Sequence, residues 1–291
     1  MNKTLKNIIT AVLALLGLAF TVMSIIAKLQ RDNDKYKLDS SQQNPFYKKK
    51  VKFIENEDEP ANADGKCGHL EAIGDSNYTP TFYAKYIKRG IDAVLSFFGM
   101  VVLAPVFAIS AIAIKTDDPG PVIFKQKRIA QGNGYFDVLK FRTMKMDTPH
   151  NVPTHQLSDP DSYLLRSGKI MRKLSIDELP QFWSIFKGDM TIIGPRPALW
   201  NQDYLTAERD KYGANDIAPG LTGLAQISGR DELEIEEKAR LDGEYAKALK
   251  ESSWSGFKAD VSLFIRSVFA VLGSEGVVEG GTGTMKKESV S

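Results

Sequence analysis

Two long runs without a charged residue constrain the fold of this chain more than any other feature. Residues 8–27 and 93–114 are uncharged and mostly apolar over 20 and 22 positions. A helix rises about 1.5 Å per residue, so about 20 apolar residues span the hydrocarbon core of a bilayer. The pattern therefore predicts two membrane-embedded helices.

The first run has the properties of a retained anchor. Basic residues flank it on both sides, with more after it than before: Lys3 and Lys6 against Lys28, Arg31, Lys35 and Lys37. This bias predicts that the C-terminal side is cytoplasmic. A cleaved signal peptide is the alternative, but the run is longer than a signal-peptide core and has no clear cleavage site at its end. We therefore expect a transmembrane anchor over residues 1–28.

The second run carries Pro105 near its middle, where proline removes a backbone donor and kinks or breaks a helix. Basic residues lie on both sides of the run: Lys85, Lys88 and Arg89 before it, and Lys115, Lys125, Lys127 and Arg128 after it. A straight span would place one basic flank outside. The sequence thus predicts a re-entrant helix over 87–115 that breaks at Pro105 and leaves both flanks cytoplasmic. A fully buried helix of a soluble protein is the alternative.

The remaining segments predict a mixed, helix-rich α/β domain over residues 81–272. Residues 122–124 and 136–141 have β-type composition with a glycine-rich turn between them, which predicts a short hairpin. Helices are expected over 163–187 in two pieces, 200–213 and 232–250, a strand over 190–193, and turns over 219–229. Residues 29–80 are interpreted as a partly disordered linker and 273–291 as a flexible tail.

Residues 258–272 place apolar side chains at i, i+3, i+4, i+7, i+8 and i+11, which is an amphipathic pattern. This helix would either pack on the domain or lie in the membrane interface.

Composition narrows the chemistry. The net charge is +2 with 25% charged residues, which argues against a nucleic-acid partner bound through bulk charge. One cysteine excludes an intramolecular disulfide framework and a cysteine-rich zinc site, and three histidines leave little for a histidine-based metal centre.

Asp177 and Glu178 are the candidate chemical groups. Ser175, followed three residues later by Glu178, matches a capping box, which predicts a helix over 176–187 and explains the acidic pair as ordinary capping. The basic surroundings suggest more: Lys140, Arg142, Arg128, Arg172 and Arg196. A carboxylate among cations suits a phosphate-handling site, because it can attack a phosphoryl group while arginines clamp phosphate oxygens. Mg²⁺ held partly by Asp177 would screen a diphosphate from the attacking anion.

Several segments together resemble one family, the bacterial sugar transferases, which are monotopic polyprenyl-phosphate hexose-1-phosphate transferases. The matching motifs keep one order over roughly residues 83–272: 88–92, 118–122, 126–128, 140–144, 173–183, 187–190, 193–197, 219–223 and 226–230.

The resemblance implies transfer of a sugar 1-phosphate from a UDP-sugar to undecaprenyl phosphate with release of UMP, in the first membrane step of exopolysaccharide, capsule or glycoconjugate assembly. It implies Mg²⁺ as cofactor, Asp177 as the nucleophile that carries the phosphosugar, and Glu178 as its assistant. It also implies a phosphate or nucleotide contact for Arg196, and a re-entrant helix in the bacterial inner membrane with the catalytic domain on the cytoplasmic face. The family's helix break is commonly Ser-Pro, and here Ala104 takes the place of the serine.

Two other functions stay open on the sequence alone. One is a catalytically degenerate membrane scaffold of a polysaccharide assembly complex. The other is a processive glycosyltransferase, which would release UDP instead of UMP. The residues do not reveal which sugar is transferred or which pathway the protein serves. A homo-oligomer and contacts with other polysaccharide assembly enzymes are both possible partners on the sequence alone.

Overall fold

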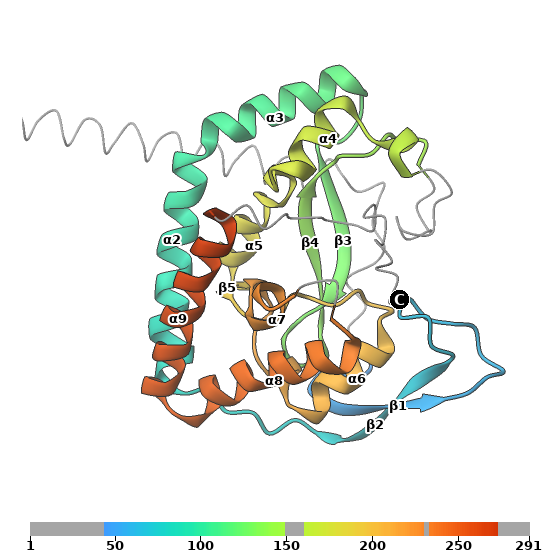
Figure 1. Cartoon of the computed structure of the whole chain (residues 1–291), viewed down its shortest axis with the longest axis vertical. Helices are drawn as coiled ribbons and strands as arrows, with labels where there is room; N and C mark the ends of the chain where they lie inside the picture. Colours follow the sequence, from blue (N-terminus) through green and yellow to red (C-terminus); the bar gives the residue numbers. More distant parts are fainter. Residues whose placement is uncertain (1–43, 149–159, 230–232, 273–291) are drawn as a thin grey trace, which may run out of the picture.

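A computed structural model describes residues 44–148, 160–229 and 233–272. The predicted N-terminal anchor and the predicted tail lie outside these residues. Helices dominate the described part of the chain, and each of its three small sheets has two strands. The elements form a helix-rich α/β domain, as the sequence predicted, with a long bent helix pair along two of its sides (Figure 1).

The bent pair confirms the predicted helix break. A short π-helix, η2 (Tyr83–Lys88), continues into α2 (Arg89–Val102), and α3 (Ala104–Asp117) follows after a 60° bend. Pro105 lies in the first turn of α3, where its missing N–H costs nothing because the first amides of a helix have no partner. No single helix among the described residues is long and apolar enough to cross a bilayer, whereas this pair meets that test together.

The hairpin predicted between residues 120 and 147 is also present. β3 (Ile123–Ile129) pairs antiparallel with β4 (Tyr135–Phe141) across the short 3₁₀ turn η3 (Gln131–Asn133). One core cluster joins this hairpin to α3 and α4 (Arg166–Lys173), and its fully buried side chains include Ile114 and Ile123. Phe107 of α3 and Phe141 of β4 meet edge to face in this core.

The second half of the domain packs around a short parallel pair of strands. β5 (Thr191–Ile193) pairs with β6 (Gly220–Thr222), so the predicted turn region over 219–229 also contains a strand and the short helix α7 (Leu224–Ile227). Helices α6 (Asp203–Lys211) and α8 (Ile235–Glu251) agree with the predicted helices. Two further 3₁₀ turns are η5 (Pro160–Tyr163), which precedes α4, and η7 (Ala214–Asp216), which follows α6.

Helix α9 (Ser253–Leu272) both packs on the domain and leaves an apolar face uncovered. Gly256, Asp260 and Leu263 are buried against η2 and α8. The opposite face exposes large apolar side chains, as do α2 and α3: Trp254, Val261, Phe264, Ile265, Val268 and Phe269 on α9, and Val94, Phe98, Val102, Ile109 and Ile112 on the bent pair. The two alternatives for this helix are thus not exclusive, because one face packs while the other is free to meet lipid.

The structure corrects the interpretation of residues 44–80 as part of a loose linker. β1 (Lys49–Glu55) and β2 (Gly68–Asp75) form an antiparallel hairpin that packs on α6. Two carboxylates of the domain hold it: Asp210 accepts the backbone N–H of Val51 at 2.9 Å, and Asp216 accepts Lys50 Nζ at 2.7 Å. These partners lie about 160 residues apart in sequence, so local composition gave no sign of them.

Candidate active site

The turn that carries Asp177 and Glu178 differs from the predicted helix start. Ser175 has a left-handed backbone (φ 53°) and makes no side-chain capping hydrogen bond. Its N–H donates to the carbonyl of Arg172, so it ends α4 and cannot also adopt the extended conformation of an N-cap. Asp177 and Glu178 consequently lie in a separate 3₁₀ turn, η6 (Ile176–Glu178), and helix α5 (Gln181–Lys187) begins only after Pro180.

Two cations from distant segments hold the Glu178 carboxylate. Lys140 of β4 places Nζ 2.9 Å from Glu178 Oε1, and Arg196, three residues after β5, places Nη2 2.7 Å from the same oxygen. Glu178 is only 8% exposed, so these charge-assisted bonds act in a partly desolvated setting. The structure therefore brings together three predicted site residues from three separate segments: the η6 turn, β4 and the loop after β5.

Asp177 is more buried and less satisfied. It is 3% exposed, its Oδ2 lies 4.0 Å from Lys140 Nζ, and its Oδ1 has no hydrogen-bond partner among the described residues. Burial raises the pKa of this carboxyl above its usual value; Lys140 and Arg172 oppose the rise, and the neighbouring Glu178 charge adds to it. This oxygen could therefore contact a cation or a ligand without giving up a hydrogen bond within the protein.

The other predicted cations are held elsewhere. Arg142 is buried and pairs with the Asp118 carboxylate, at 2.5 Å, and with the Asp118 carbonyl, so it braces the end of α3 rather than the acidic pair. Arg128 donates to the carbonyl of Pro197 at 2.9 Å and to Gln126, which places it behind the Arg196 segment.

Arg172 occupies an intermediate position. Its Nε donates to the Thr143 hydroxyl at 3.0 Å, and its charge lowers the pKa of Asp177. Of the five predicted cations, the structure thus places Lys140 and Arg196 on Glu178, leaves Arg172 acting on Asp177 through its field, and gives Arg128 and Arg142 bracing contacts.

Two residues that hold the site were not among the predicted ones. Arg89 and Asp92, near the start of α2, contact α5 and β5 through hydrogen bonds. Their signal in the sequence is the Lys88–Asp92 motif, which is part of the family resemblance and of the basic flank before the apolar run. Lys88, moreover, is not a free flanking charge, because it is buried with Nζ 2.9 Å from Asp260 Oδ2.

The acidic pair offers Mg²⁺ only one carboxylate oxygen that has no partner among the residues that the structure describes. No group of three or more metal-ligating side chains lies together in the described parts of the chain. Mg²⁺ is usually bound by one or two carboxylates, with water and substrate phosphates completing its shell. The unpartnered Asp177 Oδ1 can supply one such ligand, whereas Glu178 is already held by two cations.

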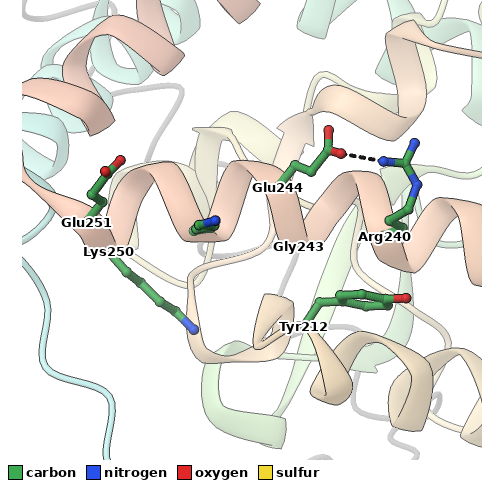
Figure 2. Close-up of a pocket in the computed structure, with 7 residues that line it drawn as sticks. Tyr212, Arg240, Gly243, Glu244, Lys250 and Glu251 are labelled. Carbon is green, nitrogen blue, oxygen red and sulfur yellow. Dashed lines mark hydrogen bonds and ion pairs between the residues drawn. The ribbon is translucent and has the colours of Figure 1, made fainter.

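An open pocket of about 680 Å³ lies elsewhere, between the end of α6 and one side of α8 (Figure 2). Tyr212, Gly243 and charged side chains of α8 line it, and Arg240 pairs with Glu244 at its edge. None of the predicted site residues lines this pocket, so it is separate from the acidic pair.

The fold and the site together define a class of protein. Its domain is flanked by a bent apolar helix pair, and its site holds a partly desolvated acid pair beside two cations that could bind phosphate. The model of the bacterial sugar transferase family matches residues 83–274, and the chain belongs to this family.

Curated relatives carry consistent names. The chain is 36% identical over 193 residues to the undecaprenyl-phosphate glucose phosphotransferase of Komagataeibacter xylinus, a match that covers 63% of this chain and 36% of that protein. It is 36% identical over 194 residues to the UDP-glucose:undecaprenyl-phosphate glucose-1-phosphate transferase of Caulobacter vibrioides, covering 64% and 69%. It is 38% identical over 165 residues to the UDP-N-acetylgalactosamine-undecaprenyl-phosphate N-acetylgalactosaminephosphotransferase of Aeromonas hydrophila, covering 56% and 38%. The matched region thus spans little more than a third of two of these relatives and about two thirds of the other.

Proposed function

We propose that this protein transfers a sugar 1-phosphate from a UDP-sugar to undecaprenyl phosphate and releases UMP. One observation carries the proposal: Asp177 has a buried, unpartnered carboxylate oxygen beside Glu178, which Lys140 and Arg196 hold. Membership of the sugar transferase family and the names of three relatives support the donor and acceptor classes.

In the first step the Asp177 carboxylate attacks the sugar-bearing phosphorus of the donor. A bond forms between an Asp177 oxygen and that phosphorus, and the bond from the phosphorus to the bridging oxygen breaks, so UMP leaves with that oxygen. Lys140 and Arg196 lie where they can bind phosphate oxygens, Arg196 through its two-pronged guanidinium. Bound Mg²⁺ would neutralise charge on the diphosphate.

In the second step a phosphate oxygen of the lipid attacks the same phosphorus, and the bond to Asp177 breaks to regenerate the carboxylate. Glu178 is adjacent to Asp177 and is held by two cations, so it can orient the incoming phosphate or take up a proton. Because UMP can leave before the lipid binds, we expect ping-pong kinetics.

The lipid acceptor requires the site to lie at a bilayer surface. The exposed apolar side chains of α2 and α3 supply a lipid-facing surface, and both ends of the bent pair return to the domain. We propose that the pair enters one leaflet of the inner membrane and that the domain lies on the cytoplasmic face, as the basic residues on both sides of the pair predict. Cysteines placed at positions 85 and 117 should then be labelled from the same side.

The test is UMP release by the full chain in vesicles that contain undecaprenyl phosphate, over UDP-glucose, UDP-galactose and UDP-N-acetylhexosamines. Asp177→Asn keeps the shape of the side chain but removes the nucleophile, so we expect a loss of at least about 1,000-fold in kcat. Mass spectrometry of the wild-type protein incubated with donor alone should find a phosphosugar on the peptide that contains Asp177.

Three outcomes would overturn the proposal. Full activity of Asp177→Asn would exclude this nucleophile. Release of UDP in place of UMP would favour a glycosyltransferase that forms glycosidic bonds directly. No turnover with any donor, together with tight binding of another assembly protein, would favour a scaffold.

A further inference from the structure

The two halves of the site lie next to two separate elements, α5 and β5. Glu178 lies three residues before α5, and Arg196 lies three residues after β5. The contact that joins them, Arg196 Nη2 to Glu178 Oε1 at 2.7 Å, therefore depends on how α5 and β5 sit relative to each other. A single turn of α2 contacts both elements.

Arg89 holds the end of α5. Its Nη1 donates to the carbonyl of Ile185 at 2.7 Å and its Nη2 to the carbonyl of Phe186 at 2.5 Å. The last carbonyls of a helix have no partner within it, and a cation there is favourable for the helix dipole. Further along α2, a Cβ on Gly99 would lie 3.3 Å from the Phe182 ring, so glycine lets α2 approach α5 closely.

Asp92, one turn after Arg89, holds β5. It is 4% exposed; its Oδ2 accepts the Thr191 hydroxyl at 2.6 Å, and its Oδ1 accepts the backbone N–H of Ile192 at 3.0 Å. Thr191 and Ile193 are the residues of β5 that pair with β6, so the Ile192 amide lies at the other edge of the strand. Asp92 supplies the acceptor that this edge needs.

We propose that Arg89 and Asp92 are positioning residues that set the separation between the Asp177–Glu178 turn and Arg196. This inference rests on the proposed function, because it assigns these residues an effect on the same transfer reaction. Neither side chain contacts the acidic pair. They act through α5 and β5, and a displacement of about 1 Å in a catalytic site costs up to about 100-fold in rate.

The inference also makes α2 a structural link between bilayer and site. The same helix that exposes Val94, Phe98 and Val102 presents Arg89 and Asp92 to the domain. A change in how α2 sits in lipid would then reach both halves of the site at once.

The experiment uses the full chain in lipid nanodiscs with two readouts: UMP-release kinetics, and hydrogen–deuterium exchange of peptides covering 176–187 and 191–196 without substrate. We expect Asp92→Ala to lower kcat by about 10- to 100-fold, to change the KM for the UDP-sugar by less than about threefold, and to speed exchange over 191–196. Arg89→Ala should lower kcat similarly and speed exchange over 176–187.

Two milder variants keep the inference testable if Asp92→Ala fails to fold. Thr191→Val removes only the hydroxyl that donates to Asp92, so it should lower kcat in the same direction. Asp92→Asn keeps an acceptor for Ile192 and a polar partner for Thr191, so it should retain activity within about threefold of wild type.

Ser96→Ala is the matched control, because Ser96 is fully buried on the same helix but donates only to Ala93 of α2. It should change neither kinetics nor exchange. An unchanged kcat in a folded Asp92→Ala or Thr191→Val protein, or an equal loss in Ser96→Ala, would overturn the inference. If wild type releases no UMP, the proposed function fails, but the exchange data still decide whether α2 holds α5 and β5.

Discussion

Two groups of buried acids in this protein are built in opposite ways. At the foot of the β1–β2 hairpin, Asp216 accepts Lys50, Lys250 and Ser76 within 2.7 Å, and Asp210 accepts Val51, Asn133 and Asn215 within 2.9 Å. At the candidate active site, one Asp177 oxygen has no partner among the described residues.

The pKa values of Asp216 and Asp177 shift in opposite directions, while burial raises the pKa of Asp210 despite its partners. Burial alone would raise the pKa of Asp216, but hydrogen bonds from Lys250, Lys50 and Ser76 outweigh it and hold the pKa below its usual value. The pKa of Asp177 stays raised because its cationic neighbours only partly offset burial. Both carboxylate oxygens of Asp216 are hydrogen-bonded, whereas Asp177 keeps one oxygen without a partner among the described residues, as do Asp64 and Asp242.

The largest effect on stability should come from the partnered group. Asp216→Ala leaves Lys50 and Lys250 without their carboxylate, and breaking a buried pair from one side costs about 3–5 kcal/mol. Because both lysines are about a quarter exposed, we expect a loss of about 2–3 kcal/mol in the free energy of unfolding. Denaturant unfolding followed by tryptophan fluorescence measures it.

The control for this variant is Glu237→Ala, which removes an exposed partner of Arg240 and should leave the unfolding midpoint unchanged. Equal midpoints for Asp216→Ala and wild type would show that the hairpin is not held by this network.

A pair of arginine variants should distinguish an arginine of the active site from an arginine that only stabilises the fold. Arg196→Lys replaces a fork with a single ammonium at Glu178 and should lower kcat/KM by about 10- to 100-fold with little change in stability. Arg142→Lys breaks the fork on Asp118 and should lower the free energy of unfolding by about 1–3 kcal/mol while leaving the KM for the UDP-sugar unchanged.

UMP-release kinetics and denaturant unfolding on both proteins check this pair. A raised KM in Arg142→Lys with unchanged stability would restore Arg142 to the substrate contacts that the sequence suggested.

The smallest expected effect is a pH-dependent gain in stability. A raised folded-state pKa means that ionised Asp177 destabilises the fold above that pKa. Asp177→Asn removes this cost, so we expect it to unfold at a higher denaturant concentration than wild type at pH 7. The difference should shrink as pH falls through the raised folded pKa and vanish below the unfolded value of about 3.9. A constant difference across this range would contradict the burial argument.

The sequence predicted the features whose causes are local. Pro105 fixes the break between α2 and α3, and alternating β-type residues around Gly132 specify the β3–β4 hairpin. The acid pair stood out because cations surround it in the sequence, and two of those cations do meet Glu178.

The features that the sequence did not predict depend on particular hydrogen bonds and ion pairs that composition and spacing do not reveal. Ser175 matches a capping pattern, but α4 uses it to end, which places Asp177 in a tight turn instead of a helix. Arg142 looked like a phosphate ligand, yet it pairs with Asp118, 24 residues earlier in the chain.

The hairpin at 44–80 bears on where a working fragment can begin. The family match starts at residue 83, so cloning from that point would remove Lys50, Ser76 and the Val51 amide together. Asp210 and Asp216 would remain in the domain as neighbouring carboxylates that have lost several of their hydrogen-bond donors, including one lysine. A shortened version of this protein should therefore start no later than Asn44, because β1 and β2 are part of the folded domain.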